Sequence, residues 1–164
     1  MRLVLAACAL LALNACKPSP PTAPPAASAK PVKTTGWALG VGRRSVEMVN
    51  IPASGDSRDS DLSLICAKGD GFLVLLPRLK AATGETFLTV AAGDRSHTLS
   101  VKPFEHGVQA SGPLNESLLV IFEGAAPFRF QMGGRVAGPY PPPPEAMRRA
   151  FAVTCRRLNG ESSV

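Results

Sequence analysis

The chain has 164 residues and a formal net charge of +6, from 18 lysines and arginines against 12 aspartates and glutamates. This length suits a single domain of ordinary size. The positive charge can attract anionic lipid headgroups or acidic glycans, but basic residues spread along a chain can equally serve solubility alone. Aromatic residues are few and do not alternate with basic ones, which argues against a nucleic-acid partner.

The first residues have the features of a bacterial export signal. Met1 and Arg2 form a short positive start, and an apolar stretch follows from Leu3 to Leu13. A stretch this short cannot span a bilayer core of about 30 Å, so it fits the apolar region of a signal peptide. We expect residues 1–15 to be removed. The alternatives are an uncleaved N-terminal anchor and a plain secretory peptide.

The sequence Leu13-Asn14-Ala15-Cys16 resembles the lipobox of bacterial lipoproteins. That motif has a large apolar residue, then a small residue just before a cysteine whose sulfur accepts diacylglycerol; Asn14 is a small departure from it. The resemblance implies that Cys16 is acylated and becomes the N-terminus of the mature protein. Lys17 follows in place of the aspartate that retains such proteins, which implies the outer membrane, with the domain in the periplasm.

Residues 16–35 read as a lipidated cysteine followed by a linker. The linker, KPSPPTAPPAASAKPVKTT, is rich in proline and has no large apolar residue except Val32. Such a composition cannot bury enough surface to order itself, so we expect a disordered tether. At polyproline spacing it would reach about 50 Å. The alternative is a docking ligand, because Pro18-Ser19-Pro20-Pro21 is similar to PxxP motifs.

The sequence pattern of residues 36–160 is typical of a β-rich domain. Short apolar or alternating runs are separated by glycine turns such as Lys68-Gly69-Asp70-Gly71. The expected strands are Trp37–Val41, Ser45–Ile51, Leu62–Cys66, Phe72–Leu76, Thr86–Val90, His97–Val101, Val108–Ala110 and Phe128–Met132.

Three later segments complete the expected fold. Leu118–Phe122 fits a strand or a short helix capped by Asn115, and Gly133–Tyr140 is expected to be a loop. Glu145–Leu158 is expected to be a helix, because Pro144 and Glu145 favour its start and two arginines favour its end. We therefore predict a mainly β domain, a small antiparallel β-sandwich or rolled sheet with one C-terminal α-helix. Residues 161–164 are expected to form a disordered tail.

Two cysteines remain once Cys8 leaves with the leader and Cys16 is acylated. Cys66 and Cys155 lie in an expected strand and the expected helix, and an oxidising compartment favours one disulfide between them. Closing a loop of about 90 residues would contribute up to about 4 to 5 kcal/mol in the chain-entropy model. A free reactive thiol or a metal pair is the alternative.

The order of Trp37, Cys66 and Cys155, with strands between the cysteines and a helix carrying the last, resembles small exported β-sandwich domains. The invasion-associated locus B type and the type VI secretion-associated TagO type are the most similar in this respect. The resemblance implies a disulfide-bonded sandwich over residues 36–158. It carries over no functional residue.

No pattern of residues identifies a reaction. The spacing of His97 and His106 matches no metal motif, GxSxG is absent, and Gly40–Ser45 begins like a dinucleotide loop without its third glycine. Other candidate carboxylates are Asp56, Asp59 and Asp61, which could offer oxygens to calcium but surround an arginine, and Glu47, Glu85, Glu105 and Glu123. We expect no catalytic site, no cofactor and no metal.

The leading hypothesis is a membrane-anchored, non-enzymatic lipoprotein that contacts a protein partner in the cell envelope. The alternative is a small-ligand or inhibitor module, in which polar groups of the segments Pro52–Asp61 and Gly133–Pro144 line a cleft. An enzyme ranks third.

Replacing the acylated cysteine tests the anchor. We expect metabolic labelling with palmitate to mark the wild-type chain and to be lost in Cys16→Ser, because serine lacks the sulfur that accepts the lipid. Cys8→Ser is the matched control, since Cys8 leaves with the leader, and it should label like the wild type. Equal labelling of Cys16→Ser would contradict the lipoprotein hypothesis.

Overall fold

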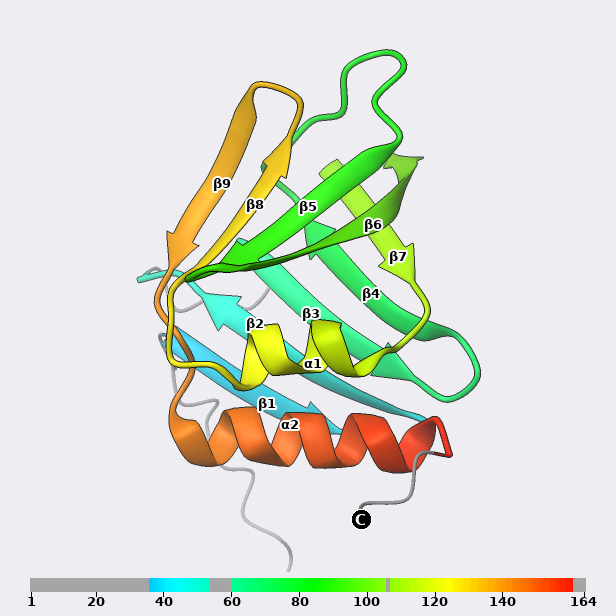
Figure 1. Ribbon diagram of the computed structural model, residues 1–164, viewed down its shortest axis with the longest axis vertical. Helices are drawn as coiled ribbons and strands as arrows, with labels where there is room; N and C mark the ends of the chain where they lie inside the picture. Colours follow the sequence, from blue (N-terminus) through cyan, green and yellow to red (C-terminus); the bar gives the residue numbers. More distant parts are fainter. Residues whose placement is uncertain (1–35, 54–59, 106, 161–164) are drawn as a thin grey trace, which may run out of the picture. The chain divides into compact units, whose positions relative to one another are not determined.

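The computed structural model describes residues 36–53, 60–105 and 107–160. They form a nine-stranded antiparallel sheet with the order β1-β2-β3-β4-β7-β6-β5-β8-β9, together with two helices (Figure 1). The elements are β1 (Gly36–Val41), β2 (Ser45–Ile51), β3 (Leu62–Ala67), β4 (Gly71–Leu76), β5 (Phe87–Ala92), β6 (Arg95–Phe104), β7 (Gly107–Gly112), α1 (Glu116–Glu123), β8 (Phe128–Met132), β9 (Arg135–Tyr140) and α2 (Glu145–Leu158).

The mainly β fold with a C-terminal helix is confirmed, and each of the eight expected strands overlaps an observed one. The expected signal peptide, acylated cysteine, tether and C-terminal tail lie outside the described residues. Neither described helix is long and apolar enough to cross a membrane.

The sheet is rolled, so that β5, β6, β8 and β9 pass over β1 to β4 (Figure 1). Side chains alternate between the two faces of each strand, and one face of every central strand is buried inside the roll. α2 packs on β2 and β3, α1 packs on β5 and β6, and the two helices contact each other. The helices therefore connect the two halves of the roll.

Aromatic rings fill the space where the helices meet the sheet. Phe122 of α1 stacks on Phe72 of β4, with ring centroids 5.0 Å apart, and meets Phe128 of β8 edge-on at 5.2 Å. Phe151 of α2 lies edge-on to Phe72 at 6.2 Å. All four side chains are at most 1 % exposed. Such pairs add about 0.5 to 1.5 kcal/mol each beyond the burial of their area.

The ambiguous segment Leu118–Phe122 is helical. The side-chain oxygen of Asn115 accepts the backbone N–H of Leu118 at 2.9 Å, which is the geometry of a helix N-cap. At the other end of α1, the buried Arg148 of α2 donates a hydrogen bond to the carbonyl of Gly124. A cation at the carbonyl end of a helix also offsets its dipole there.

The expected loop over Gly133–Tyr140 is wrong. Arg135–Tyr140 is the edge strand β9, which forms a hairpin with β8 through Gly133-Gly134. Gly133 has a φ of +56°, which glycine adopts without strain. The strand escapes a pattern-based prediction because it has no fully buried residue and contains Gly138 and Pro139.

α2 is joined to β3 by a disulfide between Cys66 and Cys155, whose Cα atoms lie 5.6 Å apart. This separation lies within the range of ordinary disulfides.

Arg156 of α2 forms ion pairs with two carboxylates of α1, because its guanidinium lies 2.6 Å from Glu116 and 2.8 Å from Glu123. Both carboxylates raise the pKa of Arg156 by hydrogen bonding, so it stays charged.

The disulfide should stabilise the fold. We expect Cys66→Ala combined with Cys155→Ala to lower the free energy of unfolding by about 2 to 4 kcal/mol, because the unfolded chain loses its cross-link. Urea denaturation followed by circular dichroism measures this change. Dithiothreitol should lower the stability of the wild type similarly and leave the double variant unchanged. A wild type that is insensitive to the reductant would contradict the disulfide.

Candidate functional site

A hollow with several polar side chains lies beside the edge strand β9. We call it the polar pocket. It has a volume of about 430 Å³, and its polar rim is formed by Asn50 of β2, Asp61 before β3, Arg78 after β4 and Tyr140 of β9. Asp61 belongs to the first of the two segments that the sequence suggested as walls of a cleft, and the whole of β9 belongs to the second. The structure thus brings parts of both segments together.

An ion pair lies on the rim of the polar pocket. The Nε atom of Arg78 is 2.8 Å from Oδ1 of Asp61, while the Arg78 side chain is 68 % exposed and that of Asp61 only 25 %. The contact is an ion pair and not an aligned hydrogen bond, because Oδ1 of Asp61 has no hydrogen-bond partner among the described residues. A guanidinium has five N–H donors in a planar fork. Arg78 therefore keeps a water-facing edge that can bind a carboxylate or another acceptor from a second molecule.

Tyr140 supplies a phenol to the same rim. Its hydroxyl donates to the backbone carbonyl of Asp61 at 3.3 Å, and its ring lies edge-on to Phe130 at 5.9 Å. Burial raises the pKa of Tyr140, and the nearby Asp61 carboxylate raises it further, against a lowering by Arg78. At neutral pH the phenol is therefore protonated and acts as a hydrogen-bond donor. It cannot serve there as a general base.

The polar pocket follows the edge of β9. Five consecutive residues, 136–140, line it. Successive residues of a strand point to opposite faces, so a pocket that touches all five lies along the edge of the strand. Among the described strands only β8 pairs with β9. The other edge of β9 therefore presents backbone groups that a further strand can pair with.

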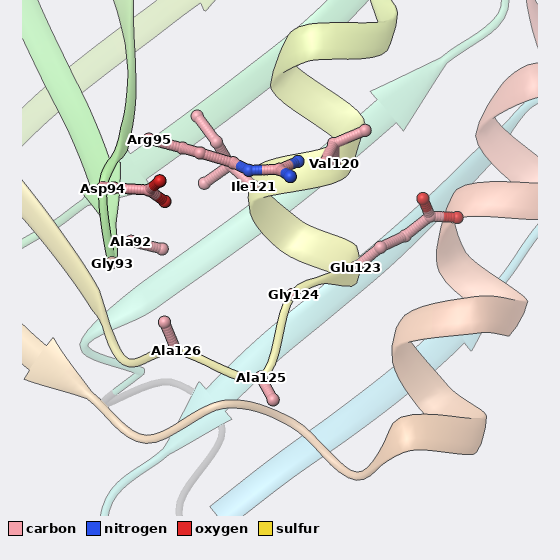
Figure 2. A pocket seen from close by; sticks show the side chains of 10 residues that line it. All are labelled: Ala92, Gly93, Asp94, Arg95, Val120, Ile121, Glu123, Gly124, Ala125 and Ala126. Atoms are coloured by element: carbon pink, nitrogen blue, oxygen red, sulfur yellow. The ribbon is translucent and has the colours of Figure 1, made fainter.

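A second hollow, of about 390 Å³, lies between the β5–β6 turn and the end of α1 (Figure 2). Arg95 extends across it toward Val120, whereas Glu123 points away toward α2, where it pairs with Arg156. Much of the remaining wall is glycine and alanine. Because few polar groups converge there, this hollow is the weaker candidate for a specific site.

His97 lies in a small polar cluster at the start of α1. Its two ring nitrogens are each 3.4 Å from a partner, the amide nitrogen of Asn115 and the hydroxyl of Ser117. The Ser117 hydroxyl donates to the side-chain oxygen of Asn115 at 2.8 Å, and that oxygen also accepts the N-cap bond. The serine proton is thus directed at Asn115 and not at the imidazole. This arrangement does not activate Ser117 as a nucleophile.

The acidic candidates are dispersed. Glu85 pairs with Arg135 and Glu123 with Arg156, so these two carboxylates neutralise arginines and do not face each other. Glu47 lies on β2, and Glu105 follows β6.

Gly40–Ser45 contains the turn of the β1–β2 hairpin and is not a dinucleotide loop. His106, Asp56 and Asp59 lie outside the described residues, as does Cys16. Within the described part of the chain, no three or more His, Cys, Asp or Glu side chains are grouped to hold a metal ion.

No protein-family model, curated protein or solved structure matches this chain. The choice of site therefore depends on geometry. Sequence reasoning had suggested the two segments that border the polar pocket but missed Arg78, Asn50 and the edge strand itself. A lone arginine after a strand carries no local signal that marks it as part of a site.

The titration of Tyr140 tests the environment of the polar pocket. Tyr140 is the only tyrosine of the chain, so the absorbance of tyrosinate reports on it alone. We expect a midpoint above the usual value of about 10. The unfolded chain releases this proton at lower pH than the folded chain, so stability falls as pH rises above about 10 toward the folded pKa. Tyr140→Phe should remove this part of the pH dependence.

Asp61→Asn provides the control for that titration. It removes the second cause of the shift, so the midpoint should fall but stay above about 10, because burial is the larger cause. A wild-type midpoint at or below that value would contradict the burial of the phenol.

Proposed function

We propose that this protein is a lipid-anchored, non-enzymatic protein of the cell envelope that binds an extended segment of a partner protein at the polar pocket. The observation that carries the proposal is the position of the pocket along the edge of β9 with which no described strand pairs, next to Arg78. Edge strands bind peptides by adding a strand, in which backbone hydrogen bonds give affinity and neighbouring side chains give selectivity.

The hairpin register indicates which backbone groups are available. Met132 and Arg135 flank the two-residue turn and form the closing pair of the β8–β9 ladder. Such a closing pair exchanges its backbone hydrogen bonds, so the backbone groups of the next residue, Val136, point to the free edge. The Val136 side chain is 57 % exposed. It offers apolar contact beside the charged Arg78.

The chemistry of the site supports binding in place of catalysis. Tyr140 stays protonated, Asp61 is engaged by Arg78, and the Ser117 proton is directed at Asn115. The Ser117 hydroxyl lies 3.4 Å from a ring nitrogen of His97, but it donates to Asn115, so this pair is not arranged as a nucleophile and its base.

The location rests on the N-terminal sequence. Leu13-Asn14-Ala15-Cys16 has the pattern of an acylation site, and Lys17 favours the outer membrane. The pairing of Cys66 with Cys155 supports an oxidising compartment such as the periplasm. A chain with several acyl groups would be held effectively permanently at a bilayer surface.

A small polar ligand is the second candidate for the same pocket. The volume of the polar pocket, about 430 Å³, falls in the range of known small-molecule sites. Asn50, Arg78 and Tyr140 contribute different polar groups to the pocket. The two candidates differ in what they require of the protein. A peptide strand needs the backbone of β9, whereas a small ligand needs the side chains.

Site-specific photo-crosslinking in cells tests the partner hypothesis. A photoreactive residue in place of Val136 should capture a protein adduct, because this position borders the proposed peptide site. Val153 on α2 is the matched control, since it is also a valine and 52 % exposed. Arg78→Glu in the Val136 reporter should reduce the adduct at least several-fold. The same adducts at both positions, or none at Val136, would contradict the proposal.

Val136→Pro separates the two candidates. Proline removes the backbone N–H that points to the free edge, so partner binding should fall while a small ligand should still bind. Val136→Ala keeps the N–H and should retain partner binding. Loss of binding in Val136→Ala alone would favour side-chain contact over strand addition.

A further inference from the structure

Four basic residues from distant parts of the chain lie at one end of the domain. Arg43 and Arg44 form the β1–β2 turn, Lys68 begins the β3–β4 turn, and Arg157 is near the end of α2. We call this set the basic end. The backbone N–H of Lys68 donates to the carbonyl of Arg44 at 2.8 Å, which joins the two turns. Figure 1 shows both turns beside the red end of α2.

The position of α2 is fixed relative to these turns. Beyond Arg157, the side-chain amide of Asn159 lies 3.3 Å from Sγ of Cys66 on β3. The disulfide from Cys66 to Cys155 holds the same two elements together. The basic end is therefore a property of the fold and does not depend on a flexible segment.

The charges of the basic end are not neutralised within the described residues. Arg43, Arg44, Lys68 and Arg157 are all exposed, and no described carboxylate forms an ion pair with them. Other arginines of the domain, such as Arg78, Arg135 and Arg156, do have carboxylate partners. Asp70 is the acidic residue of the two turns. Within the part of the chain that the structure describes, the four cations thus exceed the acidic charge of the two turns.

An apolar side chain accompanies these cations. Val41 ends β1 directly before the turn and is 59 % exposed. Cations around an exposed apolar residue suit a bilayer interface, where the cations meet phosphate headgroups and the apolar group enters the boundary of the acyl chains.

The basic end and the polar pocket lie at opposite ends of the β1–β2 pair. Val41 pairs with Val46 beside the basic end, whereas Trp37 pairs with Asn50, which lines the polar pocket. At about 3.4 Å per residue, β1 separates the two ends by more than 10 Å. A surface that holds the basic end leaves the pocket on the far side.

We propose that the basic end binds the surface of an anionic phospholipid bilayer and so orients the polar pocket away from that bilayer. Each lysine or arginine near an anionic surface contributes favourably, and several together give measurable binding. If Cys16 is acylated, the residues up to Gly36 can reach about 50 Å, which is enough for the basic end to meet the same bilayer. The binding itself does not require acylation.

Vesicle co-sedimentation of residues 32–164 tests this proposal without the anchor. These residues form one compact unit that contains the whole core and the disulfide. We expect binding to vesicles of phosphatidylcholine with phosphatidylglycerol at low salt, and little binding to phosphatidylcholine alone. Binding should weaken as salt is added, because salt screens exposed charges. The measurement is the partition constant at each vesicle composition.

Charge reversal locates the surface. Arg43→Glu with Arg44→Glu should lower the partition constant by about tenfold or more, since two favourable contacts become repulsive. Arg95→Glu with Arg129→Glu is the matched control, because both residues are exposed, lie on other elements and change the net charge equally. The control should change the partition constant by less than about threefold, as expected for distant screened charges.

Three outcomes would overturn the proposal. They are equal losses in both double variants, equal binding to both kinds of vesicle, and no binding to the anionic vesicles at low salt. Binding to soluble heparin with none to anionic vesicles would assign the basic end to a polyanionic glycan in place of a bilayer. None of these results depends on whether Cys16 is acylated or on what occupies the polar pocket.

Discussion

The ring of Phe122 contacts two strands that are distant from each other within the sheet. It stacks on Phe72 of β4 at 5.0 Å and meets Phe128 of β8 at 5.2 Å, although β7, β6 and β5 separate these strands in the sheet order. Only a rolled sheet brings both strands to one side chain. Because β9 pairs with β8, the position of the polar pocket depends on this contact. Substitution at Phe122 would therefore affect a site to which it contributes no atom.

Most of the fold follows from local patterns, and the exceptions have physical reasons. Alternation marks strands such as Phe128–Met132, whose every second residue is buried. The apolar run Leu118–Phe122 fits the spacing of a strand and that of a helix. It is helical in the structure, where the side chain of Asn115 accepts the N-cap hydrogen bond. β9 has no fully buried residue, and its sequence, RVAGPY, does not alternate apolar with polar side chains, so there is no strand pattern to detect. Its pairing with β8 defines it, and pairing is not a local property.

The site was less predictable than the fold because it consists of contacts between distant segments. The Arg78–Asp61 pair and the Tyr140 hydrogen bond each join residues from different strands or loops. The basic residues look scattered along the sequence, yet the turns and α2 gather four of them at one end. The disulfide was predictable because two of the four cysteines, Cys8 and Cys16, were assigned to the leader and to acylation. Cys66 and Cys155 then remained as a pair, and this argument needs no spatial information.

The start of β1, where the described domain begins, is held by contacts of Trp37. Trp37, the second residue of β1, donates from Nε1 to the carbonyl of Pro141 at 2.7 Å, and its ring lies edge-on to Phe128 at 6.0 Å. β1 is an edge strand, so a force on the preceding chain would act on its hydrogen bonds one pair at a time, starting at Gly36. The indole anchors that starting point to the opposite half of the roll. Peeling of β1 from β2 beyond its first residue therefore also requires breaking the contacts of Trp37 with Pro141 and Phe128.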